Sequence, residues 1–523
     1  SSDVCSSDLC LLTFSSALLG AGIYTSNNDS LTLCQSKFSF NDAPSGGAVY
    51  ASNITTVNVF NCIFENNKAS TAGAALYIAN VNDLLCINGQ FTQNLPDGVG
   101  AIYVDSTLSS TFIQCTIANN SSYLQAGIMF NNSPANIRNS IFYGNSVFDV
   151  GFIDVTANGA ASTLSICNYM ASSSTSIINT GGAPAPTLIN IAAPEGTNPQ
   201  FLSIVDYRLD ATSPARDKGD IAALTVRNCS GTPVPVGVSI DVDTALHQRV
   251  WTTIPDLGAY EFQSPLWSFF DGILTPLPNN MCPEPPSPPA DSIIYVKPVP
   301  SGSGTGLSWA DASDLAYALT NSSATQNQIW LDQGLYNSGG PYFIKEGTAI
   351  YGGFDATTNP SSLSQRNPVL YPSIISGNSS IRVFDVVGIM GATFLIFDSL
   401  TITNGQAFIG DAFGAGIRNL QTAPMTVRNC SFGANILADN GKGGAIYCEN
   451  ISVLTICDCS FEQNNSGGIV GTTGGAVATK NVPTVNFYKV TFNNNSAYVA
   501  GGGVDIVNEI GRASCRERVS SPV

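Results

Sequence analysis

The amino-acid sequence predicts an all-β chain that folds as two tandem parallel β-helices, each a solenoid of stacked coils. Two observations support this prediction. A short motif recurs at nearly constant intervals, first near the N-terminus and again after residue 400, and a proline-rich stretch separates the two regions. Self-similarity at a fixed period is typical of a solenoid, in which each unit buries its apolar face only by stacking on its neighbours.

The clearest mark of the repeat is Phe-x-x-Asn, which recurs at steps of 26, 27, 26 and 25 residues in the first region. Its copies there are Phe38–Asn41, Phe64–Asn67, Phe91–Asn94, Ile117–Asn120 and Phe142–Asn145. A second mark, one or two glycines followed closely by an aromatic residue, keeps the same interval. We therefore expect like residues to lie over one another along the stack, and the asparagine side chains to hydrogen-bond from coil to coil.

Within one unit, the residues seven and five places before the phenylalanine are apolar, a period of two that favours a strand with one buried face. Asparagine often stands three places before it, as in Asn61 and Asn139, and tolerates the left-handed backbone of a sharp corner. Each unit is thus several short strands joined at corners. We expect a structural ladder formed by Phe38, Phe64, Phe91, Phe142, Phe432, Phe461 and Phe492.

The aromatic residues of the second mark recur at 26, 27, 26 and 27 residues. Each follows an aliphatic residue or methionine that we expect to point into the coil, so the period of two turns the aromatic side chain outward. The sequence thus predicts an outer aromatic ladder formed by Tyr24, Tyr50, Tyr77, Tyr103 and Phe130. Such a ladder is a candidate surface for a flat partner such as a sugar chain. In the alternative interpretation, neighbouring rings and loops cover it and it only stabilises the shaft.

The glycine-rich and Phe-x-x-Asn marks together resemble the repeats of polymorphic outer membrane protein-type chains and related bacterial surface proteins with right-handed parallel β-helices. Residues 206–209, 213–217 and 256–261 look like the closing segment of such a domain. Residues 295–309, 329–336 and 351–354 resemble the opening segment of another. The resemblance implies two tandem right-handed parallel β-helices, both truncated.

The expected domains follow from these marks. Residues 10–262 form the first β-helix with its closing segment, residues 263–291 a proline-rich linker, and residues 292–508 the second β-helix, truncated at its C-terminal end. Residues 1–9 and most of residues 509–523 resemble translated sequencing adaptors and are set apart from the fold. A helix over residues 309–320 is expected to cover the end of the second stack.

Few residues offer catalytic or metal-binding chemistry. His247 is the only histidine, so Ser-His-Asp and Cys-His catalysis would both need it, and the cysteine spacing does not fit a zinc site. Four cysteines share one repeat position and are expected to be buried thiols, whereas three irregularly placed cysteines are better candidates for disulfides. The first set is Cys62, Cys115, Cys430 and Cys459, and the second is Cys167, Cys229 and Cys282.

Carboxylates are spread thinly, because only 11% of the residues are charged. Polysaccharide lyases and hydrolases on this fold use carboxylate clusters on one outer face. Asp105 and Asp154 could share a face but belong to coils two apart, and Asp241 and Asp243 lie near the expected domain end. We therefore predict no catalytic, cofactor-binding or metal-binding residues.

These observations favour a non-enzymatic secreted or cell-surface protein, with a role in adhesion or cell-envelope contact. The alternatives are a polysaccharide lyase or glycoside hydrolase on the same fold, and a spacer for a missing domain. The net charge of −17 disfavours nucleic acid as a partner, and no stretch approaches the ~20 apolar residues of a spanning helix. We expect a monomeric shaft at the outer membrane surface or outside the cell, with a glycan or a host or neighbouring cell as partner and no cofactor.

Overall fold

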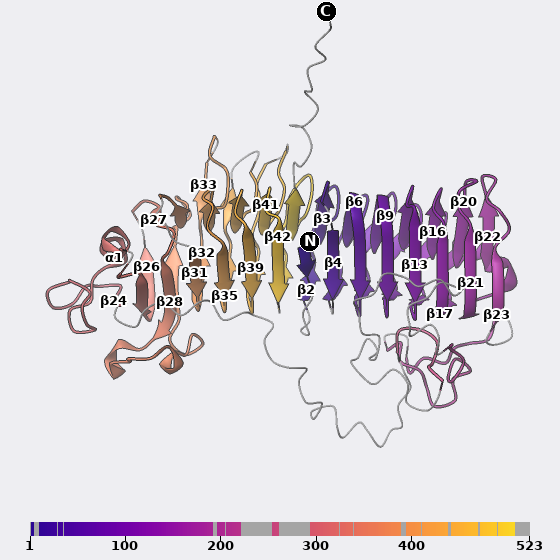
Figure 1. The fold of residues 1–523 in the computed structure, drawn as a ribbon, viewed down its shortest axis with the longest axis horizontal. Helices are drawn as coiled ribbons and strands as arrows, with labels where there is room; N and C mark the ends of the chain where they lie inside the picture. The colour runs from indigo at the N-terminus through magenta and orange to yellow at the C-terminus, as the bar shows by residue number, and fades with distance from the viewer. Residues whose placement is uncertain are drawn as a thin grey trace, which may run out of the picture.

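The computed structural model describes residues 2–4, 10–191, 196–220, 254–260 and 293–507, apart from short gaps at 29, 35, 204–205, 324, 338, 389–393, 409, 438–440, 469–470 and 489. In these residues the chain is an all-β parallel β-solenoid of about 15 coils. Figure 1 shows the coils stacked side by side along one axis. Three columns of parallel strands run the length of the stack and form its wall.

The first strand column carries the Phe-x-x-Asn motif. In spatial order its strands are β26 (Gly334–Asn337), β29 (Ser373–Ser376), β32 (Leu400–Thr403), β36 (Ser431–Gly433), β40 (Ser460–Glu462), β43 (Thr491–Asn493), β2 (Cys10–Thr13), β5 (Ser36–Ser39), β7 (Ile63–Glu65), β10 (Gln90–Thr92), β14 (Thr116–Ala118) and β17 (Ala135–Tyr143).

The second strand column carries the aromatic residues of the glycine-rich mark. Its strands are β27 (Tyr342–Ile344), β30 (Phe384–Val386), β34 (Ile417–Asn419), β38 (Ile446–Glu449), β41 (Val477–Lys480), β44 (Val504–Val507), β3 (Ile23–Ser26), β6 (Val49–Phe60), β9 (Leu76–Ile87), β12 (Ile102–Asp105), β16 (Ile128–Asn131), β20 (Val155–Asn158) and β22 (Ile177–Thr180).

The third strand column is in two parts, and in the second part β6, β9 and β17 continue into it from the other columns. One part contains β24 (Ile293–Val296), β25 (Gln328–Asp332), β28 (Ala349–Phe354), β31 (Leu395–Asp398), β35 (Met425–Arg428), β39 (Val453–Cys457) and β42 (Thr484–Tyr488). The other contains β1 (Ser2–Val4), β4 (Ser30–Cys34), β13 (Ser109–Ile113), β21 (Leu164–Met170) and β23 (Thr187–Ile191).

Short strands line the corners. They are β8 (Lys68–Ala69), β11 (Leu95–Pro96), β15 (Ser121–Ser122), β18 (Ser146–Val147), β19 (Gly151–Phe152), β33 (Gln406–Ala407) and β37 (Ile436–Leu437). The turns into the first column use asparagine with positive φ, as at Asn61, Asn88, Asn139 and Asn429, where φ lies between 49° and 55°. Asparagine reaches this conformation more easily than other residues with a side chain, so the expected corner residue stands where the backbone requires it.

The seven phenylalanines of the expected ladder lie at one register position of the first column, and all are buried. Where phenylalanines are neighbours their rings stack face to face, with centroids 4.8 Å apart between Phe38 and Phe64 and 4.7 Å apart between Phe432 and Phe461. Leu12 and Ile117 fill the same position in two other coils. This phenylalanine ladder is the centre of a continuous apolar core.

Buried asparagines form a second internal ladder beside it. The Nδ2 group of Asn41 donates to Oδ1 of Asn67 at 2.9 Å, and the same bond links Asn67 to Asn94, Asn94 to Asn120 and Asn120 to Asn145. Each Nδ2 group from Asn67 to Asn145 also donates to a main-chain carbonyl of the preceding coil. Asn435, Asn464 and Asn495 repeat the pattern in the C-terminal half. The asparagine ladder therefore bonds each of its coils to the next and satisfies main-chain carbonyls at the corners.

The strand pairing joins the two halves of the chain directly. The C-terminal strands β43 and β44 pair in parallel with the N-terminal strands β2 and β3. In Figure 1 the yellow strands of the C-terminal half lie beside the indigo strands of the N-terminal half. The sequence predicts two separate shafts in tandem, but both halves contribute to one 30-stranded main sheet. Periodicity does not indicate this contact, because every coil of a solenoid presents the same kind of edge to the next.

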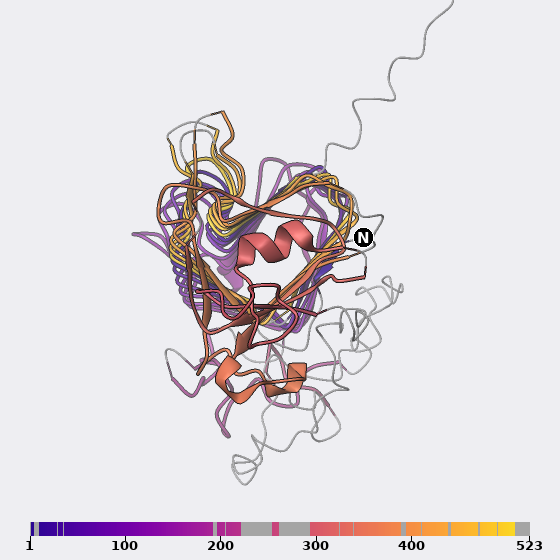
Figure 2. The same cartoon turned by 90° about the vertical axis from the view of Figure 1, so that its left-hand side faces the viewer.

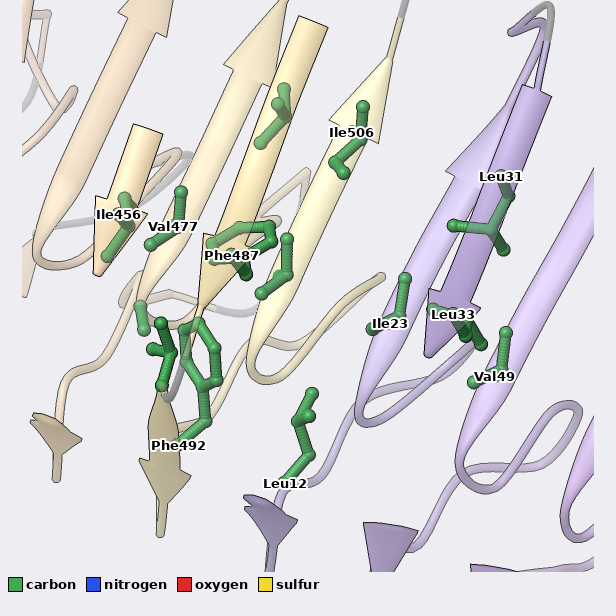
Figure 3. Close-up of a cluster of buried hydrophobic side chains, with 14 of the residues drawn as sticks. Leu12, Ile23, Leu31, Leu33, Val49, Ile456, Val477, Phe487, Phe492 and Ile506 are labelled. Carbon is green, nitrogen blue, oxygen red and sulfur yellow. The ribbon is translucent and has the colours of Figure 1, made fainter. Parts of the chain in front are cut away.

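The core is continuous across this junction. Figure 3 shows Leu12, Ile23 and Leu31 of the first coils facing Phe487, Phe492 and Ile506 of the last coils. Ser2–Val4 is expected to lie outside the fold but instead forms β1 and pairs with β4 in the same region.

The far end of the C-terminal half is covered by helix α1 (Leu315–Asn321), which contacts β24 and β27 and lies across the end of the stack in Figure 2. Its apolar side buries Leu315 and Leu319, and the Asp314 carboxylate caps it by accepting a bond from the Tyr317 amide. The expected helix is therefore present but begins six residues late, because residues 309–314 form turns that bury Trp309. Three short 3-10 helices are η1 (Ser174–Ser176), η4 (Ala356–Thr358) and η5 (Leu363–Gln365).

Residues 206–260, where described, pack along the outside of the N-terminal half. The Arg138 guanidinium pairs with the Asp220 carboxylate at 2.6 Å, and the Gly258 amide donates to the Asn139 carbonyl at 2.8 Å. The Tyr260 hydroxyl donates to Oε1 of Gln90 at 2.5 Å. This segment therefore runs back along the shaft from β23 toward the coil of β10. Residues 261–292 lie outside the described part of the chain.

Candidate binding surface

Four of the five residues expected in the outer aromatic ladder stack on one another. Tyr24, Tyr50, Tyr77 and Tyr103 hold the same register position in β3, β6, β9 and β12, and each is partly exposed. Their ring centroids are 5.4, 4.6 and 5.1 Å apart in that order. The aliphatic residue before each tyrosine is buried, so the alternation of a strand turns the rings outward.

The expectation for Phe130 is wrong. Phe130 is fully buried and pairs with Val104, whereas Met129 pairs with Tyr103 and holds the outward position. The expectation fails because it aligns Gly127 of this coil with Gly100 of the coil before. Gly127 precedes the strand directly, as Ala101 does in the coil before, so Gly127 is not the counterpart of Gly100. The tyrosine ladder therefore consists of Tyr24, Tyr50, Tyr77 and Tyr103 and ends at Met129.

Stacking determines which part of each tyrosine a partner can reach. Because neighbouring rings lie about 5 Å apart, their faces cover one another and leave ring edges and hydroxyl groups at the surface. Burial, the neighbouring phenols and Asp105 raise the pKa of Tyr77 to about 12, and burial raises the pKa of Tyr50 and Tyr103 as well. These phenols therefore stay neutral hydrogen-bonding groups throughout the physiological pH range.

A row of polar side chains begins two residues after Tyr103 and continues up the same strand column. The Nδ2 group of Asn131 donates to Oδ1 of Asp105 at 2.8 Å, and that of Asn158 donates to Oδ1 of Asn131 at 2.6 Å. The Thr180 hydroxyl donates to Oδ1 of Asn158 at 2.9 Å. All four side chains are at least partly exposed. The tyrosine ladder and this polar row therefore form two parallel lines, two residues apart across the strands, that offer hydroxyl, amide and carboxylate groups.

The outward position of the tyrosine ladder continues across the junction. Tyr24 pairs with Asp505, which is buried, and the positions beyond it hold Ala478, Tyr447, Arg418 and Asp385. Burial raises the pKa of Asp505 to about 6, and the nearby Thr473 hydroxyl and the Lys442 charge counteract this only in part. Its Oδ1 atom has no hydrogen-bond partner. A buried and only partly compensated carboxylate therefore stands at the end of the exposed tyrosines.

Further along, charged groups neutralise one another. Arg382 bonds to the carboxylates of Asp385 and Asp411 at 3.4 and 3.1 Å, and Arg418 bonds to the same two carboxylates. On the third strand column, Asp398 is buried between two arginines at 3.2 Å from each, Arg366 and Arg428. The first cluster is balanced, with two arginines and two carboxylates, whereas the second holds one more arginine than carboxylate.

Asp105 and Asp154 do not form a pair of outer carboxylates. Asp154 is fully buried and ends the asparagine ladder by accepting from Nδ2 of Asn145 at 2.7 Å. It also accepts from the amide and hydroxyl of Ser172 and from the Ser176 hydroxyl. Burial raises the pKa of Asp154, and these donors oppose the shift. Its spacing gives no hint of this role, because the repeat has already become irregular at residue 154. His247, Asp241 and Asp243 lie outside the described residues.

The cysteines of the shared repeat position are free and buried. Cys430 and Cys459 lie in neighbouring coils, and the Cys430 amide contacts the Cys459 sulfur at 3.4 Å. In the coil of Phe91 the residue at the shared repeat position is Gly89. The sulfur of Cys86 fills the space beside this glycine and lies 3.6 Å from the sulfur of Cys115. Cys167, an expected disulfide candidate, is disulfide-bonded, and so is Cys457. Cys229 and Cys282 fall outside the described part of the chain.

Comparisons with protein-family models, with curated proteins and with solved structures found no match for this chain. Within the described ranges, no three His, Cys, Asp or Glu side chains are grouped closely enough to hold a metal ion. The helices in the same residues are all too short or too polar to span a bilayer.

Proposed function

We propose that this chain is a non-enzymatic shaft, secreted or at the cell surface, that binds an extended glycan along its tyrosine ladder. Adhesion to a host or neighbouring cell, or contact within the cell envelope, is the role that such binding would serve. The observation that carries the proposal is the line of four stacked, partly exposed tyrosines, continued by the polar row of Asp105, Asn131 and Asn158.

The same proposal includes the finer description of the fold. The solenoid is right-handed, its coils are repeats like those of polymorphic outer membrane protein-type surface proteins, and the two halves are tandem units of this repeat. Support comes from the glycine-rich mark before β6 and β38 and the Phe-x-x-Asn motif in both halves. The helix α1, which covers one end of the C-terminal half, also supports a unit that begins there.

The geometry favours an elongated ligand over a single sugar ring. The tyrosine faces are covered by stacking, so a sugar cannot lie flat on them, but hydroxyl groups recur at intervals of about 5 Å. A polymer that lies parallel to the axis could bond to one coil after another. Weak individual bonds, each about 1 kcal/mol, would then add along the chain.

Substitution of two central rings tests this function. We expect the double change Tyr50→Ala and Tyr77→Ala to weaken glycan binding at least about tenfold, because two hydroxyl bonds and the ordered row are lost. Binding is measured on a glycan array and then by calorimetry with the best ligand. The matched control is Tyr123→Ala, which removes an exposed tyrosine outside the ladder. Equal binding by the double variant and the wild type would exclude the ladder as the site.

The folded state of the double variant is checked by circular dichroism and thermal melting. We also expect the wild type to release no sugar products from polysaccharides, since the two candidate carboxylates are not paired on the surface. Turnover that disappears on Asp105→Ala would instead favour a lyase or glycosidase.

A further inference from the structure

The two halves of the chain meet at a junction to which each half contributes one coil. Across this junction Leu12 pairs with Phe492, Ile23 with Val504 and Tyr24 with Asp505. Among the strands described, the pairings between residues 2–191 and residues 293–507 all lie here. The joined residues are about 480 positions apart in sequence, and the contacts between them include backbone hydrogen bonds and apolar packing between regular coil edges.

Hydrogen bonds at the junction have the ordinary geometry of the stack. The Leu19 amide donates to the Val499 carbonyl at 2.9 Å, and the Val504 amide donates to the Gly22 carbonyl at 3.0 Å. Glycine at position 502 permits this approach, because a Cβ atom there would lie 2.7 Å from the carbonyl oxygens of Ser16 and Ala21. The two faces are thus complementary in both backbone pattern and shape.

The junction also contains buried polar groups that lack a hydrogen-bond partner. The residue at the asparagine position in the coil of Leu12 is Ser15, which interrupts the ladder between Asn495 and Asn41. Its buried hydroxyl has no hydrogen-bond partner, and neither does Oδ1 of the buried Asp505. Unpaired buried polar groups cost free energy, so these two groups weaken the contact between the halves.

We propose that the junction can also form between two copies of this chain, so that the C-terminal half of one copy stacks on the N-terminal half of the other. The faces are the same within one chain and between chains, and such exchange of identical elements is a common route to dimers and open filaments. This proposal does not depend on glycan binding.

The length of the chain between the two halves determines whether the halves of one copy can meet each other or only those of a second copy. Tyr260 is anchored at the coil of β10, about ten coil steps from β24, which corresponds to roughly 48 Å along the axis. Residues 261–292 can span up to about 110 Å when extended, so one copy can close on itself. Without most of these residues, closure is impossible, and only a partner copy can fill the junction.

A deletion of residues 264–287 tests this directly. It leaves eight residues between Tyr260 and Ile293, which span at most about 32 Å and cannot reach across one shaft. Light scattering after size-exclusion chromatography should show dimers or longer oligomers whose share rises with protein concentration. A deletion variant that stays folded and monomeric up to about 100 μM would overturn the proposal.

A second substitution shows whether these oligomers use the junction. Adding Gly502→Val to the deletion variant places a side chain against Ser16 and Ala21, and should return it to a monomer at the same concentration. The control is Gly433→Val, where an added Cβ atom meets its nearest neighbour at 3.6 Å and oligomers should persist. Oligomers that survive Gly502→Val would show that association occurs elsewhere.

The full-length chain provides a measurement that does not depend on folding of the deletion variant. Wild-type protein is unfolded and refolded at about 1 μM and about 100 μM. Exchange predicts oligomers only at the higher concentration, and Gly502→Val should abolish them. Monomers alone at both concentrations would count against the proposal.

Discussion

Replacing one asparagine of the internal ladder, Asn94→Ala, should lower the free energy of unfolding by about 4 kcal/mol. The Asn94 side chain accepts from the amide and Nδ2 of Asn67, at 3.1 and 3.0 Å, and donates to the Phe64 carbonyl and to Oδ1 of Asn120. Alanine removes these four bonds and leaves buried partners unpaired, at about 1 kcal/mol or more for each. Denaturant titration followed by circular dichroism measures the change.

The matched control for this substitution is Asn58→Ala. Asn58 is an outward, partly exposed residue whose Nδ2 group donates to the Thr32 hydroxyl at 3.2 Å, where water can replace the bond. We expect a loss below about 1 kcal/mol. If Asn94→Ala and Asn58→Ala cost the same, the ladder does not contribute to stability in the way its geometry indicates.

The second large effect concerns Asp505 and pH. Its pKa of about 6 in the folded chain is higher than the ordinary value of 3.8, so folding favours the protonated carboxyl group. The stabilisation is fully present below pH 4 and is lost as the pH rises through about 6. The difference between about pH 3 and pH 7 corresponds to about 3 kcal/mol, from 1.36 kcal/mol for each pKa unit. Asp505→Asn should remove this pH dependence and stabilise the junction at pH 7.

Hydrogen exchange of the amides at the junction, such as those of Leu19 and Val504, measures the pH dependence of the stability of the junction. The exchange rates are first corrected for the intrinsic pH dependence of exchange. The groups that face Asp505 are Tyr24 on β3, Tyr447 on β38 and Lys442, and the substitution changes none of them. Asp97→Asn, at an exposed ion pair with Lys68, is the control and should change protection little. Equal pH dependence in the wild type and Asp505→Asn would contradict the assignment.

Much of the coil could be predicted from the sequence because stacking repeats the same physical demands. Each coil buries a phenylalanine and hydrogen-bonds an asparagine to the next coil. These two residues, three positions apart, must therefore recur in every coil. The inward position of Phe38 and Phe432 and the positive φ of Asn61 and Asn429 follow from that pattern. Even the outward position of Tyr50 depends only on the alternation of a strand.

The errors lie where the pattern loses its period or carries no information. The prediction for Phe130 is wrong because it follows the residue type, and the backbone position differs by one residue. A shift of one residue reverses the side that a strand residue faces. Asp154 ends the asparagine ladder at a coil whose spacing has already changed. The contact between Leu12 and Phe492 leaves no mark in the sequence, because any two coil edges of this repeat can pair.

The central claim is that both halves form one continuous stack, and a distance between two spin labels tests it most directly. Glu462, Asn493, Thr13, Ser39 and Glu65 follow one another in register, so residues 462 and 65 are four coil steps apart. Labels carried there by a non-canonical amino acid, in protein diluted with unlabelled chain, should show a narrow distribution near 19 Å. A broad distribution centred beyond about 40 Å would show that the halves are separate shafts.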